Sequence, residues 1–140
     1  ASTVLKVEVL FYFDSKNRKR QINWKHELSK HRLVEVSATI SEMKGLQNKF
    51  DLALAPKLGL GELECLAILE RQKDLKFCTF DKAAINALAL LDLEDRGISL
   101  ENALTECGLQ RNLPDKCSDK RFKRCVKQGQ QMRIMGQGLK

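Results

Sequence analysis

Two carboxylates stand at positions from which they could act on one ligand. Asp81 follows a short strand-like segment, residues 75–80, and Glu62 opens a helical segment that precedes it. Open α/β sheets bind their ligands at the carboxyl ends of the strands. Mg²⁺ takes several oxygen ligands, so carboxylates from separate elements suit it. The pair predicts a divalent-metal site, but Asp81 would equally suit a helix N-cap, and Glu62 a helix dipole.

A third carboxylate, Glu8, interrupts an apolar run over residues 4–13. It stands between Val7 and Val9, where an unpaired buried carboxylate would be energetically costly. Its side chain therefore either faces solvent or meets a positive group. Hydrophobic periodicity does not decide whether this run is a buried strand or a buried helix.

The surrounding sequence alternates between helical and strand-like segments. Hydrophobic spacing predicts helices over residues 22–29, 39–54 and 62–72, and another that begins at Asp81. Short apolar runs predict strands over residues 33–36 and 75–80, and the charged residues 14–20 are typical of an exposed loop. Ser99 can cap a short helix that Gly108 ends. The alternation predicts one α/β domain over residues 1–140, with a small parallel sheet flanked by helices.

The positive charge of the chain is concentrated at its C-terminal end. The net charge is +7, and residues 111–140 carry nine basic side chains against Asp115 and Asp119. A helix predicted there has an apolar stripe, and its outer face carries Lys120, Arg121, Lys123, Arg124 and Lys127. A localised basic surface attracts polyanions, so nucleic acid is the predicted partner; a merely solubilising face is the alternative.

Composition excludes several other classes of protein. The apolar run 4–13 is broken by Lys6 and is too short to span a membrane, and it lacks the basic start and cleavage site of a signal peptide. We therefore expect a cytoplasmic protein. The five cysteines are odd in number and include no C-x-x-C pair, which predicts reduced thiols rather than disulfides or a zinc site.

Two segments resemble the PIN-domain family of metal-dependent ribonucleases. Residues 61–69 (GELECLAIL) and 74–84 (DLKFCTFDKAA) are similar to its glutamate-led helix, short strand and T-x-D-x-A-A turn. Residues 2–10 (STVLKVEVL) resemble the segment in which a Thr or Ser caps a helix bearing the second acidic residue. The resemblance implies a PIN-like, Rossmannoid fold of which the chain holds the C-terminal two-thirds or more.

The resemblance also implies a mechanism and partners. Residues 4–13 would be helical, and Glu8, Glu62 and Asp81 would converge on one or two Mg²⁺ or Mn²⁺ ions that activate water for attack on RNA. The family includes toxins of toxin–antitoxin pairs, so an antitoxin protein and a homodimer are further implied partners.

One family element has no counterpart ahead of Glu8: a hydrophobic strand that ends in Asp. A rival alignment would use Asp14 as this Asp and Glu42 as the second acid, but it leaves only twenty positions before Glu62, against fifty-four from Glu8. We therefore expect the N-terminal strand, one catalytic Asp and the first helix to be absent from this chain. We also expect these residues alone to cleave RNA poorly and a version with the upstream segment to cleave it. The alternatives are a non-catalytic RNA-binding or protein-interaction module and an unrelated α/β domain.

Overall fold

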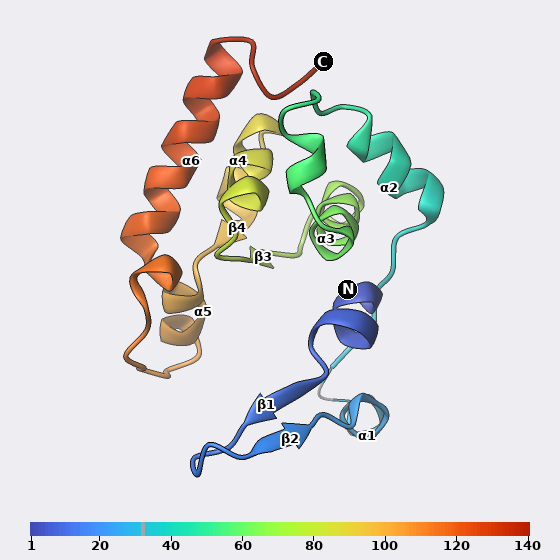
Figure 1. Cartoon of the computed structure of the whole chain (residues 1–140), viewed down its shortest axis with the longest axis vertical. Coiled ribbons are helices and arrows are strands. Elements are labelled where there is room, and N and C mark those ends of the chain that lie inside the picture. Colours follow the sequence, from blue (N-terminus) through green and yellow to red (C-terminus); the bar gives the residue numbers. More distant parts are fainter. Residues whose placement is uncertain (32) are drawn as a thin grey trace.

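The computed structural model describes residues 1–31 and 33–140 and is a mixed α/β structure (Figure 1). In chain order the elements are η1 (Val4–Glu8), β1 (Phe11–Phe13), β2 (Lys19–Gln21), α1 (Trp24–Ser29), α2 (Ile40–Gln47), η2 (Ala55–Lys57), α3 (Leu60–Arg71), β3 (Phe77–Cys78), α4 (Lys82–Leu90), η3 (Glu94–Arg96), β4 (Gly97–Ile98), α5 (Leu100–Glu106), η4 (Asp115–Cys117) and α6 (Asp119–Ile134). None of the helices in the described part of the chain is long and apolar enough to cross a membrane.

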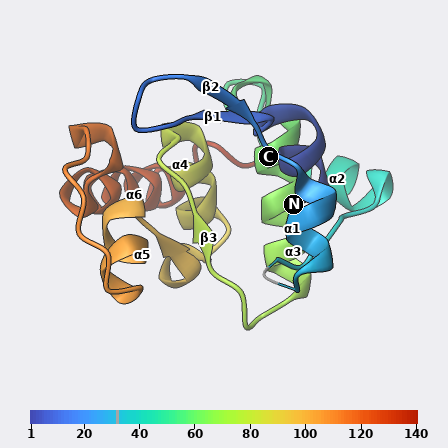
Figure 2. The same cartoon turned by 90° about the horizontal axis from the view of Figure 1, so that it is seen from below.

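The core lies between four helices. Helix α4 packs beside α6 and α3 beside α2, with β3 between the two pairs (Figures 1 and 2). Phe50, Leu66, Ile85 and Leu88 are among its most completely buried side chains. Gly129 lets α6 approach α4 closely, because a Cβ at this position would lie 2.8 Å from the Cβ of Ala89.

The strand expected over residues 75–80 is shorter in the structure. Strand β3 pairs in parallel with β4, in the register Phe77 with Gly97 and Cys78 with Ile98, and α4 connects the two. Just before β4, Arg96 donates hydrogen bonds to the carbonyl oxygens of Leu69 (2.6 Å), Gln72 and Leu75. A cation at these carbonyls suits the C-terminal end of a helix, so Arg96 fixes this end of α3 against the parallel pair.

The N-terminal segment differs from the helix implied for residues 4–13. A single π-helical turn ends at Glu8, and the chain then forms a β1–β2 hairpin. Asp14 stabilises the turn because its Oδ1 accepts hydrogen bonds from the backbone N–H groups of Lys16 and Arg18. Residues 14–20 are therefore a hairpin turn and the start of β2 rather than a loop alone.

Two further expectations are wrong. Residues 33–36 form no strand. The helix expected over residues 39–54 ends at Gln47, because Asp51 draws the chain toward the C-terminal segment. The Asp51 carboxylate accepts hydrogen bonds from the N–H groups of Leu54 (2.8 Å) and Gly138 (2.9 Å).

The predicted helices around the candidate site are confirmed. Helices α3 and α4 lie where the sequence places them, and Asp81 is the N-cap of α4. Ser99 caps α5, and Gly108 follows that helix with a φ of +70°. Helix α6 buries Phe122 in its apolar stripe.

A buried carboxylate ties the N-terminal segment to α3. Glu64 is only 3% exposed. Its Oε2 accepts a hydrogen bond from the N–H of Thr3 (2.7 Å), and its Oε1 accepts a longer one from Ala38 (3.4 Å). The resemblance implied a Thr or Ser cap at this point; Thr3 is the residue before η1, but its side chain forms no cap, and its backbone N–H contacts Glu64. One side chain of α3 thus holds two segments that precede it in the sequence.

We predict that Glu64→Ala lowers the free energy of unfolding by about 3 kcal/mol, because it leaves two backbone N–H groups without their acceptor. Glu64→Gln should cost less, about 1.5 kcal/mol, because its amide keeps one acceptor oxygen. Urea denaturation measures both values. Glu106→Gln is the control, since it removes only an exposed ion pair with Lys76 and should change stability by less than about 1 kcal/mol. Equal losses in Glu64→Ala and the control would contradict the assigned role of Glu64.

Candidate functional site

The three carboxylates selected from the sequence line one cleft. This carboxylate cleft has a volume of about 320 Å³ and lies where η1, the start of α3 and the end of β3 meet. Its lining residues are Val4, Glu8, Val9, Gly61, Glu62, Cys65, Phe77, Cys78, Thr79, Phe80, Asp81 and Leu100. The fold thus brings Glu8 to the same cleft as Asp81, seventy-three positions further along the chain.

Glu8 lies against the first turn of α3. An added Cβ at Gly61 would stand 2.3 Å from Glu8 Oε1 and 2.7 Å from Oε2, so the carboxylate occupies the space that a larger residue would fill. The N-terminal end of a helix carries partial positive charge and is a favourable position for an anion. Among the described residues, no hydrogen bond or ion pair holds the Glu8 carboxylate.

Glu62 lies at the same end of α3. Its Oε2 would be 2.4 Å from a Cβ added at Gly59, which is the N-cap of the helix. This position suits the helix dipole, as the sequence allowed. Within the described part of the chain no hydrogen bond or ion pair fixes the Glu62 carboxylate. Glu8 and Glu62 therefore lie close to the same helix end without neutralising partners.

Asp81 has a defined structural role as well as its place in the cleft. Its Oδ1 accepts a hydrogen bond from the N–H of Ala84 (2.9 Å), which caps α4. Its own backbone N–H donates to the hydroxyl of Thr79 (3.2 Å). Asp81 is exposed, so capping leaves its other carboxylate oxygen available to a ligand.

The donor types in the cleft fit a hard dication, but their positions do not yet form a metal site. Three carboxylates from three elements are suitable ligands for Mg²⁺ or Mn²⁺. In residues 1–31 and 33–140, however, no group of three or more His, Cys, Asp or Glu side chains is close enough to hold one ion. Binding an ion would require Glu8 and Glu62 to rotate toward Asp81.

A basic surface begins directly beside Asp81. Lys82, the first residue of α4, lines a cleft of about 480 Å³ together with Arg121, Arg124 and Lys127 of α6; we call these four side chains the basic track. A neighbouring cleft of about 830 Å³ is lined by both Asp81 and Lys82. The carboxylate cleft and the basic track therefore meet at the start of α4.

The five basic residues predicted on α6 are not equivalent. Arg121, Arg124 and Lys127 belong to the basic track, and Lys120 is exposed one turn before Arg124. Lys123 instead lies beside Asp119, with its Nζ 2.7 Å from Asp119 Oδ2. Its charge is balanced locally, so it has less to offer a polyanion than the other four.

Sequence reasoning did not select some residues that shape the site. Lys82 follows Asp81 directly at the predicted helix start, and this neighbouring acid and base could have identified Lys82 as a site residue. Gly61 provides the space for Glu8, but the close contact depends on the placement of η1. Glu64 lies two positions after Glu62, and no local pattern distinguishes the buried carboxylate from the one in the cleft.

The cleft changes the acidity of one of its cysteines. All five thiols are free. Burial raises the pKa of Cys65 from its usual 9.0 to about 11, and the negative charges of Glu64, Glu62 and Glu8 add to the rise while the N-terminal ammonium group opposes it. The three glutamates thus all lie close enough to the Cys65 thiol to oppose its ionisation.

Comparisons with protein-family models, curated proteins and solved structures give no match for the chain. The resemblance to PIN-domain nucleases therefore rests on its sequence segments alone.

We predict that Cys65 resists alkylation by iodoacetamide at pH 8, while the exposed Cys107 reacts. The folded state holds the Cys65 proton more tightly than the unfolded chain does. Its contribution to stability is therefore complete below about pH 9 and is lost as the pH rises toward 11. Peptide mapping by mass spectrometry gives the order of reaction. Reaction of Cys65 at pH 8 as fast as that of Cys107 would contradict the placement of Cys65 in this cleft.

Proposed function

We propose that this chain is a metal-dependent endoribonuclease domain of PIN type. Glu8, Glu62 and Asp81 are its proposed Mg²⁺ or Mn²⁺ ligands, and RNA is its proposed substrate. The observation that carries the proposal is the shared cleft of these three carboxylates, which adjoins the basic track at the start of α4.

The arrangement suits the cleavage of a phosphodiester. The basic track can hold phosphates on either side of the reacting one, because Arg121 and Arg124 offer planar donors and Lys82 a point charge. Lys82 adjoins Asp81 in the sequence, so a phosphate bound by Lys82 lies next to the carboxylate cleft. Glu8 and Glu62 complete an acidic wall there. A dication, when bound, would polarise the phosphate and lower the pKa of its water.

The same surfaces support a second candidate, an RNA-binding module without catalytic activity. It is favoured by the spread of the carboxylates, since no three of the candidate side chains in the described residues are close enough to share an ion. Asp81 and Glu62 also have helix-terminal positions that explain them without chemistry. Binding without metal-dependent cleavage is the outcome that this candidate predicts.

We predict that the protein cleaves single-stranded RNA with added Mn²⁺ and that Asp81→Asn lowers the rate by at least about 100-fold. Asparagine retains the cap on Ala84 but loses the charge, so the melting temperature should stay within a few degrees of wild type. Gel analysis of labelled RNA measures cleavage, and circular dichroism measures melting. Full activity in Asp81→Asn would show that Asp81 is only a helix cap.

Gly61→Ala tests the position of Glu8 without removing its charge. The added methyl group would displace the Glu8 carboxylate, and a misplacement of about 1 Å can cost on the order of 100-fold in rate. The control is Gly45→Ala, a helical glycine at which an added Cβ meets nothing within 4 Å. It should retain full activity. Equal activity in both variants would show that the contact between Glu8 and Gly61 does not contribute to catalysis.

We predict that neutralising the basic track weakens RNA binding and flattens its dependence on salt. Each of Lys82→Gln, Arg124→Gln and Lys127→Gln should reduce the slope of log affinity against log salt by about 0.7, the value for one phosphate contact on a single strand. Fluorescence anisotropy between low and high NaCl measures the slope. Lys123→Gln is the matched control on the same helix, because Asp119 already balances its charge. Unchanged slopes in the track variants would show that this face only confers solubility.

A further inference from the structure

The β1–β2 hairpin exposes three consecutive aromatic rings. Phe11, Tyr12 and Phe13 are 41%, 54% and 59% exposed. Successive side chains of a strand point to opposite faces, so Phe11 and Phe13 share one face and Tyr12 occupies the other. Neither face of the hairpin is buried. Contiguous exposed apolar surface of this kind indicates a binding site rather than part of a core.

Basic side chains are interleaved with these rings. The second strand places Lys19 opposite Phe13 and Arg20 opposite Tyr12. Residues 16–25 carry five Lys or Arg and no Asp or Glu. Asp14 Oδ2 pairs with two of them, Arg18 (3.0 Å) and Arg20 (3.1 Å), and leaves the lysines. The ammonium group of Lys19 lies 3.9 Å from the centre of the Phe11 ring and covers one face of this ring. Phe13 contacts the Phe11 ring in an edge-to-face arrangement, with ring centres 5.7 Å apart, and is the more exposed of the two. Tyr12 and Phe13 are therefore the rings best placed to stack on a ligand.

The hairpin is rigidly connected to the element that carries Glu8. Strand β1 begins three residues after Glu8, a distance of about 10 Å along an extended chain. The Trp24 indole N–H donates to the carbonyl oxygen of Val9 (2.7 Å), and the Ile22 N–H donates to that of Leu10 (3.0 Å). These bonds fix the base of the hairpin between η1 and α1.

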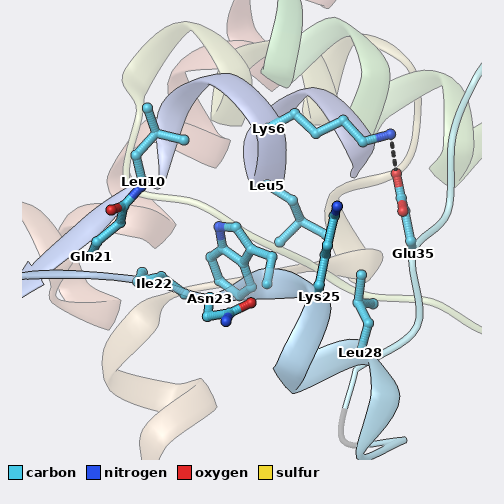
Figure 3. A pocket seen from close by; sticks show the side chains of 10 residues that line it. Leu5, Lys6, Leu10, Gln21, Ile22, Asn23, Lys25, Leu28 and Glu35 are labelled. Carbon is cyan, nitrogen blue, oxygen red and sulfur yellow. Dashed lines mark ion pairs between the residues drawn. The ribbon is translucent and has the colours of Figure 1, made fainter.

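A hollow of about 680 Å³ continues the surface at the hairpin base (Figure 3). Leu5 and Lys6 come from η1, and Lys25 comes from α1, while Lys6 also forms an ion pair of 2.7 Å with Glu35. A ligand that lies along the hairpin would thus meet a further cation, Lys25, before it reaches η1. The tip of the hairpin points toward the side of the molecule on which α5 and α6 lie (Figures 1 and 2).

We propose that the β1–β2 hairpin is a second RNA-binding surface that selects single-stranded RNA by stacking Tyr12 and Phe13 on unpaired bases. Lys16 and Lys19, whose charges are not taken up by Asp14, bind the phosphates between those bases. Bases stack on aromatic rings without sequence preference, whereas the bases of a duplex are already stacked on each other. The inference rests on the proposed function for the identity of the ligand and adds the selection of unpaired strands.

The charge of the hairpin favours RNA over a protein partner. A protein-binding strand edge or apolar patch needs complementary apolar surface, and a dense row of cations beside it would select an acidic partner. RNA supplies both kinds of contact from each nucleotide: a flat base for a ring and a phosphate for a cation. The alternation of rings in β1 with cations in β2 matches that chemistry.

The test is the binding of a fluorescein-labelled 12-nucleotide oligouridine RNA and of an RNA duplex of equal length, both in EDTA so that no cleavage occurs. Tyr12→Leu and Phe13→Leu remove the ring and keep an apolar side chain, while Tyr12→Phe and Phe13→Tyr keep the ring. The leucine variants should bind the single strand about tenfold more weakly, and the ring-preserving variants should bind like wild type. Leu52→Ala, at a residue that is 87% exposed, is the control for loss of surface apolar area.

Several outcomes would overturn the inference: unchanged single-strand affinity in the leucine variants, equal losses for the duplex, or a wild-type chain that binds no RNA. Loss of self-association in sedimentation, or of binding to phosphatidylserine vesicles, with unchanged RNA affinity would assign the rings to another partner and overturn it too. Failure of the proposed nuclease function is distinguishable. If only the nuclease function fails, wild type cleaves nothing but the hairpin leucine variants still lose RNA affinity. If only the hairpin inference fails, wild type cleaves RNA and the hairpin variants bind it normally.

Discussion

The arrangement of the molecule depends on one buried carboxylate. Glu64 projects from α3 and accepts hydrogen bonds from Thr3 and Ala38, so the N-terminal segment and the segment before α2 are fixed to the same helix. A buried carboxylate is tolerated only when such donors meet it. Because η1 follows Thr3 directly, this contact also determines where Glu8 lies. The position of one acidic residue in the cleft is thus set by another that is outside it.

Each of the three carboxylates in the cleft lies at a helix end and is also a candidate metal ligand. Glu8 and Glu62 lie near the positive end of α3, and Asp81 caps α4. The N-terminal end of a helix carries partial positive charge, which makes it a favourable position for a carboxylate. These structural positions are compatible with metal binding, because they place three carboxylates along one cleft. Lys82 and the basic residues of α6 place positive charge directly beside the cleft.

The sequence predicted those parts of the site that depend on interactions between neighbouring residues. The apolar faces of α3 and α4 and the capping preference of Asp81 depend on neighbouring residues, so their sequence was sufficient. The hairpin was not predicted, because its aromatic strand needs the partner strand Lys19–Gln21 to be stable. The end of α2 at Gln47 depends on Asp51 bonding to Gly138, which is 87 residues away. Glu64 is buried because the N-terminal segment covers its side of α3, whereas Glu62 lines the cleft. This difference depends on tertiary packing, which the local sequence does not encode.

The central claim is that Glu8, Glu62 and Asp81 can turn toward one dication. Paramagnetic broadening tests it most directly, with substoichiometric Mn²⁺ added to ¹⁵N-labelled protein. The account predicts that the amide signals of Glu8, Glu62, Thr79 and Asp81 disappear first, and that Mg²⁺ in excess restores them. Signals that persist around the carboxylate cleft, or that first disappear around the acidic residues of η3, would contradict it.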